Sequence, residues 1–223
     1  LVGRVDPLKE TTLLTLCPPK VRKPTLIAGF SGYGDVGRIT VELLAEFVKA
    51  EKFAELFSPS LPDYVNSDKF GVCQLPHLDF HYRHNGNLDV ILLSGSDIPA
   101  YDDPEASYHL CDRILEIVRS FSCHRILAIS GYPTSNQSSL GRIFVAATSA
   151  ALVRQYQAKG ASRFVGKKIV GMAGILLGLA KTKRMPSVAI LSGVRRRAAG
   201  RPVALRTFRF LCKALDLEAA GRA

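Results

Sequence analysis

The first apolar run of the chain ends in glycines with the spacing of a phosphate-binding turn. The segment PTLIAGFSGYGDVG covers residues 24–37, and its Gly32, Gly34 and Gly37 match the pattern G-x-G-x-x-G. In such a motif the chain leaves a strand, turns tightly and enters a helix whose first N–H groups and dipole attract phosphate. Ser31, Gly32, Gly34 and Gly37 are therefore candidate residues for binding a nucleotide or another anion.

Three interpretations fit this turn. A dinucleotide site also needs an acidic residue about 20 positions further on, at the end of the second strand, and the residue near that distance, Glu55, falls inside an expected strand. The second interpretation is a phosphate or nucleotide pocket of another kind, with residues 131–138 across the cleft. The third is a structural turn, in which glycines permit chain reversal and close packing.

Histidines near position 80 resemble a metal site in their spacing. His77, His81 and His84 follow Cys73 within a stretch expected to be extended. On a strand that rises about 3.3 Å per residue, His77 and His81 would stand about 13 Å apart, and His84 would point to the other face. Zinc ligands must lie within about 2.0–2.3 Å of one point. The sequence therefore predicts structural or solvent-exposed histidines and no metal site.

No catalytic set is recognisable in the sequence. The patterns GxSxG, HExxH and GxxxxGK[ST] do not occur in it. Cys111 has His109 nearby, but side chains two positions apart on a helix point in different directions. We therefore expect no catalytic residues and no cofactor, and we expect Cys111 to belong to a buried helical stripe.

Positive charge is concentrated in the last third of the chain. The net charge is +11, but the residues from position 150 onward carry 16 lysines and arginines against two acids, a net of +14. An acidic protein surface fits this end better than nucleic acid, because interleaved aromatic residues for base stacking are missing. The alternative is a solvated face that keeps an oligomer soluble. The predicted partner-binding patch consists of Arg195, Arg196, Arg197 and Arg201.

Strands and helices are expected to alternate along the chain. After a first strand ahead of the glycine turn, the strand-like segments are residues 53–59, 70–75, 78–84, 88–93, 125–130, 142–148, 168–170 and 187–191. The helical segments are 38–50, 104–121, 149–159, 172–183 and 202–217. Asn85-Gly86 predicts a tight hairpin turn. Uniformly apolar strands between helices predict an α/β fold, a three-layer α/β/α sandwich with a mixed, mostly parallel sheet.

Composition indicates one soluble domain over residues 1–223. The chain has 47% hydrophobic residues, enough for a full core, and no linker-like or repeated tract. Its five cysteines are scattered without a CxxC pair, which favours reduced thiols in the cytoplasm. The uncharged apolar run at residues 169–180 is too short to cross a bilayer, so no membrane partner is expected.

Three segments together resemble the PAC2 family, the proteasome assembly chaperone 2-like proteins. They are GFSGYGDVG (29–37), LAISGY (127–132) and GMAGILLGLAKTKRMPSVAILS (171–192), and the similarity covers about residues 24–218. The resemblance implies a phosphorylase/hydrolase-like α/β/α fold and a homo-oligomer or paired subunit. It also implies an assembly-chaperone role toward the 20S proteasome rather than catalysis.

Two positions depart from what the resemblance implies. Relatives that dock on the proteasome often end in a hydrophobic-Tyr-any tripeptide, whereas this sequence ends in Ala-Gly-Arg-Ala. Docking by that tail is therefore not expected unless the natural C-terminus extends beyond Ala223. After the last strand, relatives tend to carry an acid where this chain has Arg195, Arg196 and Arg197.

The sequence as a whole predicts a non-catalytic PAC2-like assembly chaperone or adaptor that works through protein–protein contacts. The alternative is a nucleotide- or phosphate-binding enzyme or sensor that uses the turn at residues 31–37.

Overall fold

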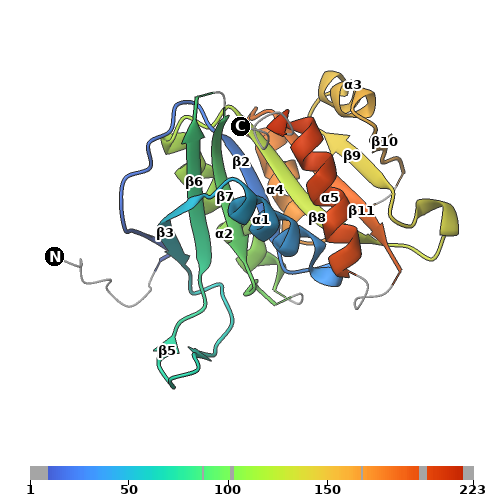
Figure 1. The fold of residues 1–223 in the computed structure, drawn as a ribbon. Coiled ribbons are helices and arrows are strands. Elements are labelled where there is room, and N and C mark those ends of the chain that lie inside the picture. Colours follow the sequence, from blue (N-terminus) through green and yellow to red (C-terminus); the bar gives the residue numbers. More distant parts are fainter. Residues whose placement is uncertain (1–9, 87, 101–102, 167, 196–199, 218–223) are drawn as a thin grey trace.

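A computed structural model describes residues 10–86, 88–100, 103–166, 168–195 and 200–217 (Figure 1). The main sheet contains β1 (Thr12–Thr15), β2 (Thr25–Phe30), β3 (Glu51–Phe57), β6 (Leu78–Asn85), β7 (Leu88–Gly95), β8 (Arg125–Pro133), β9 (Ile143–Ala147), β10 (Ser162–Arg163) and β11 (Ser187–Val194). The helices are α1 (Val36–Phe47), α2 (Pro104–Ser120), α3 (Ala150–Ala158), α4 (Met172–Thr182) and α5 (Gly200–Ala214), with short 3-10 turns at Tyr33–Asp35 and Gln137–Ser139.

The sheet has a parallel centre and antiparallel flanks. Its strand order is β1-β3-β6-β7-β2-β8-β11-β9-β10. Strands β7, β2, β8 and β11 run parallel to one another, whereas β1, β3 and β6 form antiparallel pairs that lead up to β7, and β9 runs antiparallel to β11. The mixed α/β/α sandwich predicted from the sequence is thus confirmed. The hairpin between β6 and β7 is also confirmed, and its Gly86 has a φ of 54°.

Helices cover both faces of the sheet because successive side chains of a buried strand point to opposite faces. On β2, Leu26 and Ala28 pack in the cluster with α2 and α4, while Ile27 packs in the cluster with α1, α3 and α5. Figure 1 shows α1 and α5 in front of the sheet and α2 behind it. Burial of each large aliphatic side chain contributes about 1.5–3 kcal/mol to the free energy of unfolding.

Among the described residues, no helix combines the length and the apolar character that crossing a membrane requires.

Several elements differ from the sequence prediction. Of the strand predicted at residues 70–75, only Cys73–Gln74 is extended, and it pairs with Asn66–Ser67 outside the main sheet. Strand β8 continues to Pro133, beyond the predicted end at Ser130, because it stays paired with β11 as far as Val194. The strand predicted at residues 168–170 is wrong. These residues have no regular secondary structure, and the place beside β9 is taken by β10. Gly166 and Gly171, with φ of 69° and 83°, redirect the chain on either side of them.

Direct backbone contacts fix the start of α1 against β2 and β8. A Cβ atom at Gly37 would collide with the carbonyl oxygen of Ile129, and one at Gly29 would collide with the carbonyl oxygen of Gly37. A Cβ atom at Gly131 would collide with the carbonyl oxygen of Tyr33. Glycine is required at these positions because the two backbones approach more closely than any side chain allows.

A long connection between β3 and β6 projects from the body as an arm, defined here as residues 58–77 (Figure 1). It contains the small antiparallel pair β4 (Asn66–Ser67) and β5 (Cys73–Gln74). Asp97, which is only 7% exposed, holds the base of the arm. Its carboxylate accepts hydrogen bonds from the hydroxyl of Tyr64 (2.6 Å) and the side-chain amide of Asn66 (3.2 Å).

We expect Gly37→Ala to destabilise the protein, because the added methyl group has no room beside the carbonyl oxygen of Ile129. Overpacking of this kind costs about 1–3 kcal/mol in the free energy of unfolding, which urea denaturation measures. Gly178→Ala in α4 is the matched control, because no atom lies within 4 Å of its added methyl group. A helix favours alanine there by about 1 kcal/mol. Equal stability of the two variants would contradict the packing described.

Candidate functional site

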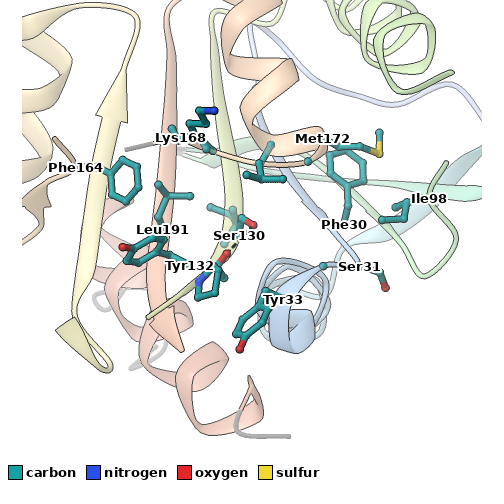
Figure 2. A pocket seen from close by; sticks show the side chains of 18 residues that line it. Phe30, Ser31, Tyr33, Ile98, Ser130, Tyr132, Phe164, Lys168, Met172 and Leu191 are labelled. Atoms are coloured by element: carbon teal, nitrogen blue, oxygen red, sulfur yellow. Dashed lines mark hydrogen bonds between the residues drawn. The ribbon is translucent and has the colours of Figure 1, made fainter. Parts of the chain in front are cut away.

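An open pocket of about 390 Å³ lies at the carboxyl ends of β2 and β8, where open α/β sheets usually bind ligands (Figure 2). Residues from six parts of the chain line it. They are Phe30 to Tyr33, Ile98, Ile129 to Pro133, Phe164, Lys168 to Ala173, and Leu191.

Apolar and aromatic side chains form most of the pocket wall. Figure 2 shows Phe164, Tyr132 and Leu191 on one side, and Phe30 and Met172 on the other. The rings of Tyr132 and Phe164 meet edge to face, with centroids 5.1 Å apart. A wall of this kind suits an apolar group, because burial of that group removes apolar surface from water.

The electrostatics of the pocket favour a negative charge on whatever enters it. Helix α4 begins at Met172 in the wall, and its first turn holds no acidic residue. The positive end of the helix dipole therefore faces the pocket. Lys168 is the single charged residue among the described residues that line it, and it is exposed at the rim. The geometry thus fits an apolar group that carries, or lies beside, a carboxylate.

The predicted glycine site divides into two parts. Ser31 and Gly32 line the pocket, whereas Gly34 and Gly37 lie outside its lining. The N–H of Gly32 donates to the carboxylate of Asp35 (3.3 Å), and the N–H of Asp35 donates back to the carbonyl of Gly32 (3.2 Å). The carboxylate of Asp35 therefore already accepts a hydrogen bond from the N–H group of Gly32, which a bound phosphate would otherwise accept.

The predicted basic patch begins beside the pocket, at Arg195. Arg195 and Arg201 are exposed, while Arg196 and Arg197 lie outside the described residues. The carbonyl oxygen of Arg195 accepts a hydrogen bond from the hydroxyl of Tyr33 (3.1 Å), and Tyr33 is part of the pocket wall. The start of the patch is thus tied to the rim.

Sequence reasoning missed much of this wall. Phe164 and residues 168–170 carry no motif, and residues 168–170 were predicted to be a strand. The signal that was available is the pair Gly166 and Gly171, which enclose only the four residues Lys-Lys-Ile-Val, because glycines at both ends are typical of a loop that changes direction.

A separate ion network forms where β3 pairs with β6. The register places Glu55 opposite Asp79, and the ammonium of Lys52 lies 2.6 Å from Glu55 and 2.7 Å from Asp79. The Nε2 atom of His77 is 3.3 Å from Asp79. The ligand atoms of Glu55, His77 and Asp79 lie within 4.8 Å of one another, a spacing that a metal ion could use. Lys52, however, already places a positive charge between the two carboxylates.

Neighbouring charges shift the pKa values of this network. The hydrogen bond to Asp79 raises the pKa of His77, although burial opposes the positive charge, and donation from Nδ1 to the carbonyl of Leu75 adds to the rise. Burial alone would raise the pKa of Asp79, but hydrogen bonds from His77 and Lys52 outweigh it and lower that pKa.

His81 borders this network, because the register places it opposite Lys52, and burial lowers its pKa. His84 lies apart from the network and pairs with Asp89 at 2.6 Å. Glu55 itself lies inside β3, as the sequence predicted, and its carboxylate is held by Lys52.

We expect His77→Gln to destabilise the protein more at about pH 5 than at about pH 8. The pKa of His77 is raised above its unfolded value of about 6.5. Its pair with Asp79 therefore contributes fully below that value, and the contribution is lost as the pH rises through the folded pKa. Urea unfolding of both proteins at the two pH values measures the difference. His109→Gln is the control because this side chain is 71% exposed, and equal losses at both pH values would contradict a charged His77.

Comparisons with known proteins identify solved structures that are similar to this chain. It is similar to the crystal structure of Pyrococcus furiosus PbaB, an archaeal proteasome activator, with 28% identity, a TM-score of 0.88, and coverage of 95% of this chain and 91% of that one. It is also similar in fold to P. furiosus PbaA, an archaeal homolog of proteasome-assembly chaperone, with 20% identity, a TM-score of 0.77, and coverage of 94% and 83%.

A curated relative and a family model add to these likenesses. An uncharacterized protein of Methanocaldococcus jannaschii is 26% identical over 167 residues, and the match spans 74% of this chain but only 64% of the length of that relative. The model of the PAC2 family matches residues 26–220, nearly the whole chain. This chain therefore belongs to the PAC2 family.

Proposed function

We propose that this chain is a non-catalytic assembly chaperone or adaptor that acts toward the 20S proteasome through protein–protein contacts. The observation that carries the proposal is the likeness to PbaB, an archaeal proteasome activator, which extends over 95% of the chain at 28% identity. Membership of the PAC2 family supports the same role. A cytoplasmic location suits such a role, and all five cysteines are free thiols in the structure.

The geometry of the pocket supports contact with a protein rather than acid–base chemistry. General acid–base catalysis uses titratable groups with pKa values tuned to the reaction. Among the described residues of the lining, Lys168 is charged, and aliphatic and aromatic side chains form most of the remainder. A concave apolar surface with a polar rim is typical of a site that receives side chains of another protein.

The basic patch gives the proposed contact an electrostatic component. Arg195 and Arg201 are exposed, and Arg195 is hydrogen-bonded to Tyr33 of the pocket wall. The last third of the chain carries a net charge of +14. Positive surface attracts an acidic partner surface and speeds its association. An acidic region of a proteasome subunit is therefore the partner surface that we propose.

We expect the chain to form a complex with 20S α subunits that native mass spectrometry detects at low ionic strength. The double variant Arg195→Glu/Arg201→Glu should weaken the complex by about tenfold, a typical effect of lost charge complementarity. The matched control is Lys20→Glu/Arg22→Glu, which changes the charge equally at exposed positions before β2, at the other end of the sheet.

Raising the salt concentration should weaken the wild-type complex and bring it closer to the Arg195→Glu/Arg201→Glu variant, since exposed charges are screened by ions. If no complex with α subunits forms at low salt, the proposed role is wrong. If both double variants bind equally, the role survives but the basic patch is not the contact.

Nucleotide or phosphate binding at residues 31–37 stays a second prediction, and the position of Asp35 weighs against it. Its carboxylate bonds the N–H of Gly32, so a phosphate would meet a negative charge. We expect inorganic phosphate and nucleotides to leave the melting temperature unchanged. Bound ligand at 100 times its dissociation constant would add about 2.7 kcal/mol of stability, which thermal denaturation detects. A shift that Ser31→Ala abolishes would restore the alternative.

A further inference from the structure

The pocket lies where two neighbouring strands of the sheet separate. Strands β2 and β8 pair in parallel only as far as Gly29 and Ile129. Strand β8 then continues beside β11 to Pro133. The first turn of α1 packs against the point of separation, since a Cβ atom at Gly37 would collide with the carbonyl oxygen of Ile129. A crevice between diverging parallel strands is the usual place for a ligand in an open α/β sheet.

The walls of the pocket are fixed by contacts within the chain. The ring of Phe164 meets those of Tyr132 and Phe144 edge to face, with centroids 5.1 Å and 6.1 Å apart. The loop before α4 touches the helix directly, because a Cβ atom at Gly174 would collide with the carbonyl oxygen of Ile169. A preformed pocket of this kind lowers the ordering cost that binding must overcome.

Helix α4 begins in the pocket wall without a side-chain cap. Its N-cap is Gly171, whose carbonyl already accepts a hydrogen bond from the N–H of Gly174 (3.0 Å). The N–H groups of Met172 and Ala173, which line the pocket, come earlier in the helix and have no acceptor inside it. Together with the exposed ammonium group of Lys168, they favour a carboxylate at this end of the pocket.

Two acidic residues lie near the pocket, and each has partners of its own. The carboxylate of Asp35 accepts a hydrogen bond from the N–H of Gly32 (3.3 Å) and lies 3.5 Å from Arg38. The carboxylate of Asp97 turns toward the arm, where it accepts a hydrogen bond from the hydroxyl of Tyr64 (2.6 Å). Neither acid belongs to the lining, so the positive charge at the start of α4 has no acidic neighbour in the pocket wall.

We propose that the pocket binds a free, small carboxylic acid with an aromatic or branched aliphatic tail while no partner protein occupies it. The tail lies between Phe164 on one side and Phe30 on the other (Figure 2). The carboxylate lies at the first turn of α4, within reach of Lys168. The volume of about 390 Å³ suits such a ligand, because small-molecule sites span about 300–1,000 Å³.

The test is a titration of indolepropionate with the full chain, followed by the fluorescence anisotropy of the indole. The chain contains no tryptophan, so the emission of the probe is free of indole emission from the protein. Indolepropionamide has the same shape without the charge, and it should bind about tenfold more weakly. Acetate has the charge without an apolar tail, so it should not displace the probe.

Two variants separate the charged end of the pocket from its apolar wall. Lys168→Gln should weaken binding of the acid by about three- to tenfold and leave binding of the amide unchanged. Phe164→Leu keeps an apolar side chain but loses the ring, so it should weaken both probes alike by about threefold. The control is Lys181→Gln, which removes an exposed charge from the last turn of α4, about 14 Å from the start of the helix. It should change neither affinity.

Absence of binding to the wild type, or equal affinity for the acid and the amide, would overturn the proposal. So would an affinity for the acid that Lys168→Gln or Phe164→Leu leaves unchanged while the circular dichroism shows a folded protein. If the acid does not bind but the same variants weaken the complex with 20S α subunits, the pocket receives the partner protein alone. The titration uses no proteasome subunit, so its result is independent of the proposed chaperone function.

Discussion

Close contact between backbones at the carboxyl end of the sheet is the constraint on which the rest of the structure depends. The first turn of α1 rests on β2 and β8 without intervening side chains, because Gly29, Gly37 and Gly131 leave only backbone between them. The same principle recurs nearby. A Cβ atom at Gly193 would collide with the carbonyl of Ser139, and one at Gly200 would collide with the carbonyl of Gly34. These contacts set where the pocket wall and the start of α5 lie.

The glycine turn shows how one spacing can serve two different purposes. In a phosphate-binding loop the glycines free N–H groups for an external anion. Here Asp35 adopts a left-handed conformation, with a φ of 50°, and turns its own carboxylate toward the N–H of Gly32. Arg38 then lies 3.5 Å from that carboxylate. Asp35 thus supplies the negative charge that an anionic ligand would bring, and Arg38 neutralises it.

The sequence was a good guide wherever a segment was buried and regular. The apolar strands, the Asn85-Gly86 hairpin and all five helices were found, because burial on both faces leaves continuous apolar runs and amphipathic helices repeat every 3.6 residues. The strand at residues 168–170 was wrong, since local β propensity does not say whether a partner strand is free. β1 was not predicted, and it depends on pairing with β3.

The candidate site was harder to predict than the fold, because it is assembled from contacts between distant segments. The register that sets Glu55 opposite Asp79 cannot be read from either strand alone. Residues 70–75 of the arm were predicted as a strand, but only Cys73–Gln74 pair there, because β propensity does not say whether a partner strand is available. The apolar residues of the arm are conspicuous only when their exposure is known.

The two edge strands of the main sheet also limit how sheets of different chains can pair with one another. One border is β1, with four residues, and the other is β10, with two. A border this short offers few unpaired N–H and C=O groups to an incoming strand, which is a common protection against fibril-like growth. Recruitment of further chains by extension of the sheet at these edges is therefore disfavoured.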